Sequence, residues 1–288
     1  RVGVVGASDD HTCRPGLAYP STQEMTVLGG LGAVFSGDLS REGIYNGMMA
    51  RHCYGTTGAR IYLDITVNNN RMGDVSNSSG PTKIWCCVHG TAPIEYIALF
   101  NRSTELRRYH PNTQSRDINR IKIIWSGATH KDRGRFMKWD GGLKMNSGII
   151  TGAIPLNMYT AKYGIDDLEE RHVTWRSITS GQEEGVLIHI DASDETVITF
   201  EAGPAKLNFT VGEVRSGDLR WELGGLEQIV TASTLHTDEN TLDTEFDYVD
   251  DNPAEGEQAY WVRVVQTDFH RAWSSPIYIE QQSEEYGQ

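Results

Sequence analysis

The sequence lacks any long apolar run, and no stretch approaches the roughly 18 apolar residues that a membrane-spanning helix needs. It is also poor in positive charge, with 26 Lys and Arg against 39 Asp and Glu and a formal net charge of −13. Binding of nucleic acid without regard to its sequence needs a basic face that displaces counterions. We therefore expect neither a membrane nor a nucleic acid as a partner, although the acidic total does not exclude a locally positive pocket.

An initiator methionine and a signal peptide are also missing, and the chain opens directly into an apolar run over residues 2–7. Because a native chain rarely begins inside a buried strand, we expect this chain to be the C-terminal part of a longer protein. Any targeting signal would lie in the missing N-terminal portion, which leaves both the cytoplasm and the periplasm open as locations.

Cysteine is scarce, with four residues in the chain. Cys86 and Cys87 are adjacent, so on a strand they point to opposite faces and suit no ordinary disulfide framework. We expect reduced thiols that pack as small side chains. The run Cys86-Cys87-Val-His89 invites a zinc interpretation, but a second ligand pair at finger-like spacing is missing, which favours packing.

The first part of the chain, residues 1–58, is expected to be the end of an α/β domain. The apolar run over residues 2–7 predicts a buried parallel strand. A loop punctuated by glycine and proline follows over residues 13–39. Ser40 then predicts the N-cap of a helix over residues 41–53, whose apolar face consists of Ile44, Met48 and Met49.

The second part, residues 59–288, changes to a period of two that is typical of half-buried strands. The clearest alternation has these apolar residues: Ile61, Leu63, Ile65 and Val67. Eleven further short strands are predicted between residues 83 and 280, and the acidic segment 238–257 is predicted to be an exposed loop. The chain is therefore expected to be α+β but mostly β, with residues 59–288 forming a β-sandwich region, or two packed sheets.

Polar residues come directly after the first apolar run, as Ser8-Asp9-Asp10-His11. Residues i and i+2 of a strand point the same way, so Asp9 and His11 converge on one point. A carboxylate beside an imidazole suits a divalent metal. The alternative is that Asp9 caps the following turn and His11 is a hydrogen-bonded core histidine.

The motif resembles the last metal-binding motif of the PHP superfamily, which is named for polymerase and histidinol phosphatase. The whole chain is similar to the C-terminal half of a large, mostly uncharacterised bacterial branch of that superfamily. Four stretches carry the resemblance: Gly6-Ala-Ser-Asp-Asp-His-Thr12; Ser40-Arg-Glu-Gly-Ile-Tyr45 with Arg51-His-Cys-Tyr-Gly-Thr-Thr-Gly-Ala-Arg-Ile61; Arg120-Ile-Lys-Ile-Ile-Trp-Ser-Gly127 with Trp139-Asp-Gly141; and Ala259-Tyr-Trp-Val-Arg-Val264 with Ala272-Trp-Ser-Ser-Pro-Ile277.

The resemblance implies the terminal strand and helix of a distorted α/β barrel that holds a cluster of divalent metal ions (Mn, Zn or Fe). It implies hydrolysis of phosphate-type or sulfate-type esters, with Asp9 and His11 at the two metal-ligand positions that carry over. The family's opening His-x-His motif and its middle Glu and His ligands have no match in this chain. We therefore expect the chain alone to be inactive and to need the missing N-terminal barrel portion as its partner.

Three residues are candidates for binding an anionic small-molecule ester: Arg14, His52 and Arg60. A guanidinium group matches phosphate or sulfate oxygens bidentately, and the glycines of residues 55–58 leave backbone N–H groups open to an anion. The alternatives are a cation at the C-terminal end of a helix for His52 and a plain connecting turn for residues 55–58.

A non-enzymatic β-sandwich module that binds a glycan or a protein is the alternative to a hydrolase. Seven tryptophans favour a sugar-binding surface, but those in or beside predicted strands are explained by packing between sheets. They are Trp125, Trp139, Trp175, Trp221, Trp261 and Trp273.

Overall fold

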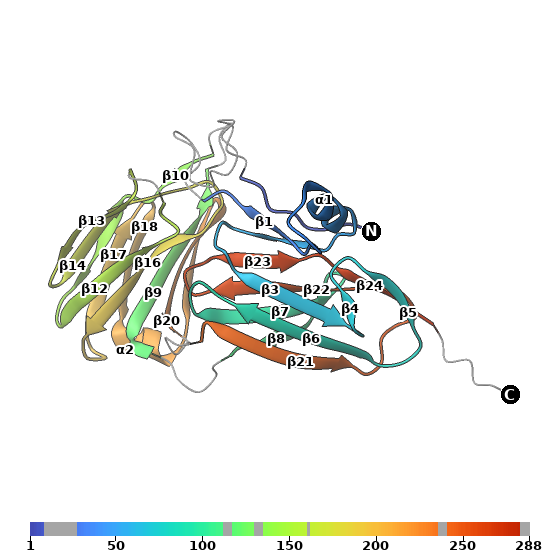
Figure 1. The fold of residues 1–288 in the computed structure, drawn as a ribbon. Helices are drawn as coiled ribbons and strands as arrows, with labels where there is room; N and C mark the ends of the chain where they lie inside the picture. Colours follow the sequence, from blue (N-terminus) through green and yellow to red (C-terminus); the bar gives the residue numbers. More distant parts are fainter. Residues whose placement is uncertain (9–27, 112–116, 130–134, 160–161, 236–240, 283–288) are drawn as a thin grey trace. The chain divides into compact units, whose positions relative to one another are not determined.

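The computed structural model describes residues 1–8, 28–111, 117–129, 135–159, 162–235 and 241–282 (Figure 1). Within these ranges the chain forms 24 strands and two helices, α1 (Arg41–Met49) and α2 (Val211–Ser216). The expectation of an α+β chain that is mostly β is confirmed. Neither helix of the described ranges is long and apolar enough to cross a membrane.

The chain folds into two compact units. Unit 1 takes in the described residues before 114 and after 236, and unit 2 takes in those from 117 to 235. The boundary at residue 58 that separates the two sequence-derived parts falls inside unit 1, because residues on both sides of it share one core.

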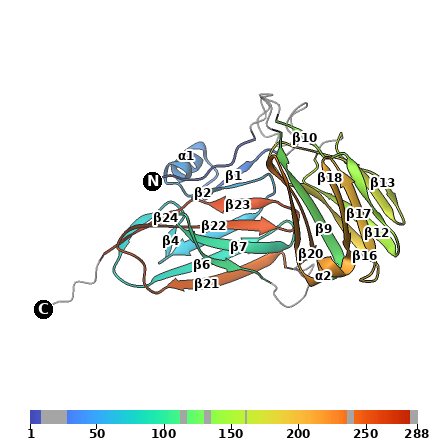
Figure 2. The ribbon, with the colours of Figure 1, turned by 180° about the vertical axis from the view of Figure 1, so that it is seen from behind.

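Unit 1 consists of two sheets. The larger sheet has the strand order β1 (Leu31–Val34), β2 (Cys53–Thr56), β23 (Arg271–Ser274), β22 (Gly256–Gln266), β24 (Ile277–Gln281) and β5 (Val75–Ser78), and β22 also pairs with β7 (Ile94–Asn101), which pairs with β8 (Thr104–Tyr109) (Figure 2). The smaller sheet has the order β21 (Asp243–Asp250), β6 (Thr82–His89), β3 (Tyr62–Val67) and β4 (Asn70–Arg71).

One hydrophobic core joins the two sheets of unit 1. Leu63, Ile65 and Val67 of β3 are fully buried, as the alternation in the sequence predicts. They belong to the same cluster as Ile97 of β7 and Val262 of β22. The predicted strand over 61–67 is therefore confirmed, and its buried face is the one that the period-two pattern indicates.

Unit 2 is likewise two packed sheets with a short strand pair beside them. The first has the order β12 (Ile149–Leu156), β16 (Glu184–Asp191), β9 (Asp117–Ala128), β20 (Leu226–Leu235) and β19 (Leu219–Gly224). The second has the order β13 (Gly164–Glu169), β14 (His172–Arg176), β11 (Gly141–Met145), β17 (Val197–Ala202) and β18 (Ala205–Thr210), and the short pair is β10 (Met137–Lys138) with β15 (Ile178–Thr179).

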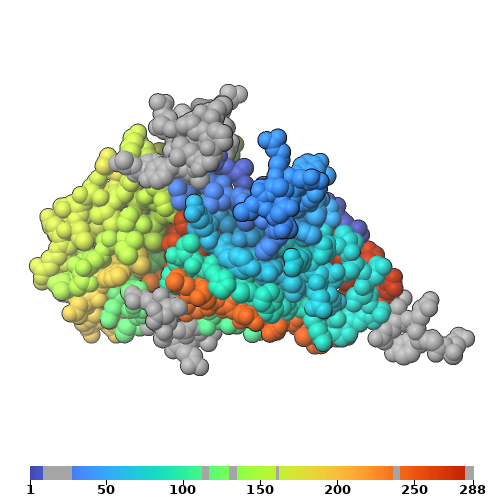
Figure 3. All heavy atoms as spheres, viewed as in Figure 1, coloured from blue at the N-terminus to red at the C-terminus, as the bar shows by residue number. Residues whose placement is uncertain are grey.

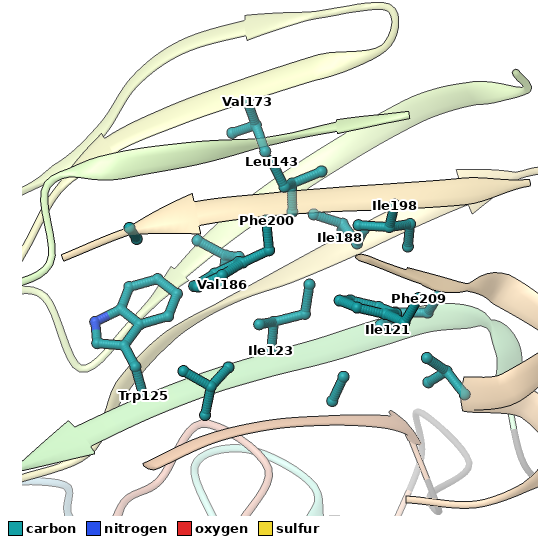
Figure 4. Packing of buried hydrophobic residues seen from close by; sticks show 14 of the residues in the cluster. Ile121, Ile123, Trp125, Leu143, Val173, Val186, Ile188, Ile198, Phe200 and Phe209 are labelled. Atoms are coloured by element: carbon teal, nitrogen blue, oxygen red, sulfur yellow. The ribbon is translucent and has the colours of Figure 1, made fainter. Parts of the chain in front are cut away.

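Side chains from both sheets of unit 2 meet in one core (Figure 4). Trp125 of β9 stacks on Trp175 of β14 with 4.8 Å between the ring centroids. Its indole nitrogen donates a hydrogen bond to Ser177 Oγ at 2.7 Å. Trp139 is also fully buried. The expectation that tryptophans in predicted strands pack between sheets is confirmed for these three.

The first apolar run does not form the expected buried strand. Residues 1–8 are extended but belong to no sheet, and Val2 and Val5 are 67% and 52% exposed. The N–H groups of Val2 and Val4 donate to Tyr278 Oη and Ser275 Oγ, each at 2.8 Å. Side chains thus take the place of the neighbouring strand that the prediction assumed.

Helix α1 is shorter than the predicted helix over residues 41–53, and its larger apolar side chains do not face the core. Ser40 caps it as expected, since its hydroxyl accepts a hydrogen bond from the N–H of Gly43 at 2.9 Å. The helix ends at Met49, and Arg51 has a φ of 63°, in the left-handed region that terminates helices. The predicted apolar face does not pack inward: Ile44, Met48 and Met49 are 41%, 44% and 61% exposed, and Gly47 is the buried residue of the helix.

The acidic segment over residues 238–257 was predicted to be a loop, but part of it forms strand β21 (Asp243–Asp250). Strand β21 pairs with β6 over its whole length. Phe246 is buried in the core, whereas Asp243, Glu245 and Asp247 are exposed on the opposite face. The density of acidic residues concealed the period-two pattern.

Glu184 is a fully buried carboxyl group at the start of β16. Ser177 Oγ donates a hydrogen bond to its Oε2 at 2.6 Å, and Gln182 Nε2 donates to its Oε1 at 3.3 Å. Burial raises the pKa of Glu184 to about 7, against the opposing effect of these hydrogen bonds. Glu184 is therefore protonated in the folded protein over a pH range in which an unfolded chain has ionised it.

Replacing Glu184 with Gln is expected to change how stability depends on pH. The raised folded-state pKa adds stability that is fully present below about pH 4.5 and is lost as the pH rises through about 7. Between pH 4 and pH 8 this amounts to a loss on the order of 3 kcal/mol in the wild type, which Glu184→Gln does not show. Urea unfolding at several pH values measures the difference. Glu201→Gln on the exposed surface is the control, and identical pH profiles for wild type and Glu184→Gln would contradict the assignment.

Candidate functional site

Residues 4–8, which lead into the predicted metal motif, lie against strands β1 and β2 at a place where both strands have glycine. Gly32 and Gly55 are partners in the β1–β2 register. A Cβ on Gly55 would lie 2.8 Å from the N of Gly6, and a Cβ on Gly6 would collide with the carbonyl of Leu31. Backbone therefore packs on backbone here, and the glycines are required for it. We call this contact the glycine seat.

Hydrogen bonds and an ion pair fix the rest of the segment. Ser275 Oγ accepts from Val4 and donates to the carbonyl of Cys53, so it ties the segment to β2. Tyr278 Oη accepts from the N–H of Val2 and donates to its carbonyl at 3.1 Å. Arg1 pairs with Glu257 at 2.6 Å on the exposed surface. The backbone that precedes Asp9 is thus held by residues from the other end of the chain.

Ser8 packs against Gly29, Gly29 packs against Gly58, and the neighbouring Thr57 contacts the buried His270. A Cβ on Gly29 would lie 2.7 Å from Ser8 Cα, and a Cβ on Gly58 would lie 2.9 Å from the carbonyl of Gly29. In the same turn, Thr57 Oγ1 is 3.0 Å from His270 Nδ1. Burial lowers the pKa of His270, which favours the neutral imidazole that binds metals or accepts protons.

His270 was missed in the sequence because nothing local marks it. It follows β22 in the sequence, more than 200 residues after Thr57, and only the pairing of β2 with β23 brings the two together. Contacts this distant in sequence leave no short motif.

The structure places His52 and Arg60 at opposite ends of β2. His52 Nε2 lies 2.9 Å from Asp74 Oδ1, and the other oxygen of Asp74 accepts from the N–H of Arg71 at 2.8 Å. His52 thus fastens the end of α1 to the turn before β5. Arg60 is exposed just beyond Gly58, on the side where residue 8 ends.

Asp9, His11 and Arg14 lie outside the described residues. Among the residues that are described, no group of three or more His, Cys, Asp and Glu side chains is arranged to hold a metal ion.

A second cluster of reactive side chains lies on the outer face of β6. Cys87 Sγ is 3.6 Å from His89 Nε2, and His89 Nδ1 is 2.8 Å from Asp243 Oδ1. Cys86, which points the other way, is fully buried, as the predicted strand requires. Burial, aided by the nearby Glu245 and Asp64 carboxylates, raises the pKa of Cys87. The thiol therefore stays protonated near neutral pH and is a poor nucleophile.

A hollow of about 420 Å³ opens further along the same sheet face. Its lining comes from β3, β6, β21 and the turn after β3: Thr66, Asn68, Asn69, Lys83, Ile84, Trp85 and Asp247. We call it the Trp85 hollow. It lies on the four-stranded sheet of unit 1, whereas the glycine seat lies on the larger sheet.

Comparisons with known proteins identify two similarities. A family described as a protein of unknown function (DUF3604) matches residues 8–79, a stretch that contains all five predicted site residues. An uncharacterised protein of Chlamydia pneumoniae is 31% identical over 121 residues, which are 40% of this chain and 20% of that protein. The match thus spans about a fifth of the relative's length. No solved structure matches the chain.

Gly55→Ala is expected to displace residues 1–8 from the glycine seat. The new methyl group would meet Gly6 N at 2.8 Å, so the segment must move or β2 must bend. We expect hydrogen exchange of residues 4–8 to rise at least tenfold, with a loss of about 1–3 kcal/mol in unfolding free energy. Gly37→Ala is the matched control, because no heavy atom lies within 4 Å of its Cβ position. Unchanged exchange in Gly55→Ala would show that the contact is not required.

Proposed function

We propose that this chain is the C-terminal part of a metal-dependent hydrolase of the PHP type, which acts on phosphate-type or sulfate-type esters and is incomplete on its own. Its motif over residues 6–12 supports the proposal. The observation that carries it is the glycine seat, which holds residues 4–8, the segment that leads directly into Asp9 and His11 in the sequence. A metal site needs ligands on a backbone that does not move.

Asp9 and His11 are the residues that would hold a divalent ion, with Asp9 as the anionic oxygen ligand and His11 as a neutral nitrogen ligand. The donor set fits Mn, Zn or Fe. When bound, such an ion lowers the pKa of a water molecule and neutralises charge on the ester. Two protein ligands fall short of a complete catalytic site, and the remaining ones would come from the N-terminal barrel portion of the same protein.

The residues around the glycine seat would bind and orient the substrate. Arg60 adds a positive charge beside the turn over residues 56–58, where a guanidinium group can pair with ester oxygens. His270 lies 3.0 Å from Thr57 Oγ1 through its Nδ1, and burial lowers its pKa, so that it enters this proposal as a neutral imidazole that orients the turn. His52 has a structural role in this proposal, because its ring is committed to Asp74.

An exposed apolar face supports the proposed partner. Seven of the fourteen exposed large apolar side chains of the described residues come from the first 49 residues: Val2, Val5, Leu39, Ile44, Tyr45, Met48 and Met49. Leu39 is 98% exposed and Met49 is 61% exposed. Helix α1 lies beside the N-terminus (Figures 1 and 2), and its atoms stand out from the surface (Figure 3). We call the four of these side chains that belong to α1 the α1 face, namely Ile44, Tyr45, Met48 and Met49, and we assign it to the N-terminal barrel portion.

Metal content tests the proposed ligands. With the N-terminal portion restored, we expect bound Mn, Zn or Fe by elemental analysis, and at least a tenfold loss of metal affinity in Asp9→Ala and His11→Ala, since each removes one ligand. His52→Ala is the matched control and should keep its metal. Unchanged metal content in both ligand variants would refute the site, and ester hydrolysis by residues 1–288 alone would refute its incompleteness.

The α1 face should contribute little to the stability of residues 1–288. We expect the double variant Ile44→Ser, Met48→Ser to change the unfolding free energy by less than about 0.5 kcal/mol, because both side chains are exposed. The buried control Ile97→Ala should cost about 2–5 kcal/mol. When the N-terminal barrel portion is supplied as a separate chain, the double variant should bind it more weakly than wild-type residues 1–288 do. A large loss of stability in residues 1–288 would mean that the face already has a partner within the chain.

A further inference from the structure

The Trp85 hollow is built from a single row of outward side chains. Trp85 of β6 is directly opposite Thr66 of β3 on one side and Asp247 of β21 on the other. Partners in an antiparallel register point to the same face, so a hydroxyl, an indole and a carboxylate stand side by side across three strands. The row is rigid because each member belongs to a hydrogen-bonded strand.

The indole ring in this row is held in one orientation. Trp85 Nε1 donates a hydrogen bond to Glu245 Oε1 at 2.8 Å, from a strand position two residues before Asp247. The ring therefore does not need a ligand to order it. A partly exposed indole that is already fixed loses little conformational entropy when a ligand covers it.

The rim of the hollow is the turn between β3 and β4. Asn68 and Asn69 have φ values of 47° and 64°, as in the two-residue turns that join twisted hairpins. Asn68 Oδ1 accepts from the N–H of Lys83 at 2.8 Å, and its amide nitrogen donates to Ser78 Oγ at 3.3 Å. Asn68 therefore stabilises the rim, while Asn69 is exposed beside the opening.

Three polar groups around the indole have no protein partner in the part of the chain that the structure describes. They are the Thr66 hydroxyl, the Lys83 ammonium group and the Asp247 carboxylate, and all three line the hollow. The lining thus offers a donor, an acceptor and a group that acts as both. Lys83 and Asp247 carry opposite charges, and Glu245 beside the indole adds a second negative charge, so the surroundings of the hollow do not favour an anionic ligand.

We propose that the Trp85 hollow is a binding site for a neutral oligosaccharide. A pyranose ring has an apolar C–H face that packs on an indole, and its hydroxyls both donate and accept hydrogen bonds. Beside the place where the sugar ring would lie, the Asp247 carboxylate can accept a hydrogen bond from a sugar hydroxyl and the Lys83 ammonium group can donate one. A phosphate or sulfate ester would meet Asp247 and Glu245, and a flat apolar ligand would leave three polar groups desolvated. The volume lies within the range of small-molecule sites.

The proposal is independent of the hydrolase. It uses no residue of the glycine seat and lies on the other sheet of unit 1. A failure of metal binding would leave it unaffected, and its own failure would leave the hydrolase proposal unaffected.

Calorimetric titration of residues 1–288 with maltohexaose, cellohexaose, xylohexaose and chitohexaose tests the proposal. We expect at least one of these four probes to bind with a Kd of about 1 mM or below. Trp85→Ala should weaken that binding at least tenfold, and Asp247→Asn and Lys83→Gln should each weaken it several-fold. Asp247→Asn removes a charge and replaces one acceptor oxygen with a donor at an exposed position, without changing the size of the side chain, so it remains informative if Trp85→Ala folds poorly.

Trp261→Ala is the matched control. Trp261 is also a partly exposed tryptophan of unit 1, but it stacks on Phe100 with 4.2 Å between the ring centroids, on the larger sheet. Its replacement should leave the affinity unchanged within twofold. The proposal is overturned if none of the four probes binds, if Trp85→Ala and Asp247→Asn bind as the wild type does, or if Trp261→Ala abolishes binding instead.

Discussion

The contact between Gly6 and Gly55 determines much of the architecture around the predicted metal motif. Because backbone lies on backbone, the position of residues 4–8 depends on the register of β1 and β2 and not on any side chain that fills the gap. That register in turn depends on β23, which pairs with β2, and on Ser275, which binds both Val4 and Cys53. The start of the predicted site and the last strands of the chain therefore form one structural unit.

The same reliance on glycine explains the exposed helix. A Cβ on Gly47 would lie 2.6 Å from the carbonyl of Phe35, so α1 approaches the chain before it through its glycines. Its larger side chains, Ile44 and Met48, are then turned outward. A helix attached in this way gains little from hydrophobic burial within the described chain. Exposed apolar side chains gathered on one element are a feature of surfaces that bind a partner, and this is the reason for including the helix in the proposed interface.

The sequence predicted features that depend on neighbouring residues, such as strands and their buried faces. It did not predict contacts between residues far apart in the chain. The alternation from Ile61 to Val67 identified a strand and its buried face, because a period of two needs no knowledge of the partner strand. The apolar pattern of α1 did not show which side of the helix packs, because such a pattern gives no weight to glycine, and Gly47 is the buried residue. His270 could not be predicted, since its place beside Thr57 depends on strand pairing across more than 200 residues. The metal ligands remain a prediction that depends on the motif.

Strand β6 alternates between buried and outward-facing side chains, and the outward-facing set contains a tryptophan. Ile84, Cys86 and Val88 are in phase and fill the core, whereas Lys83, Trp85 and His89 share the opposite phase and face outward. Tryptophan is the exception among these outward residues, which are otherwise polar. Trp85 is partly exposed, so its indole forfeits part of the stabilisation of a few kcal/mol that full burial gives a large side chain. Packing in unit 2 accounts for Trp125, Trp139 and Trp175 but gives no reason for Trp85. A ligand that covers the ring would supply one, and the unpaired groups of Thr66, Lys83 and Asp247 beside it indicate that such a ligand has both polar and apolar surfaces.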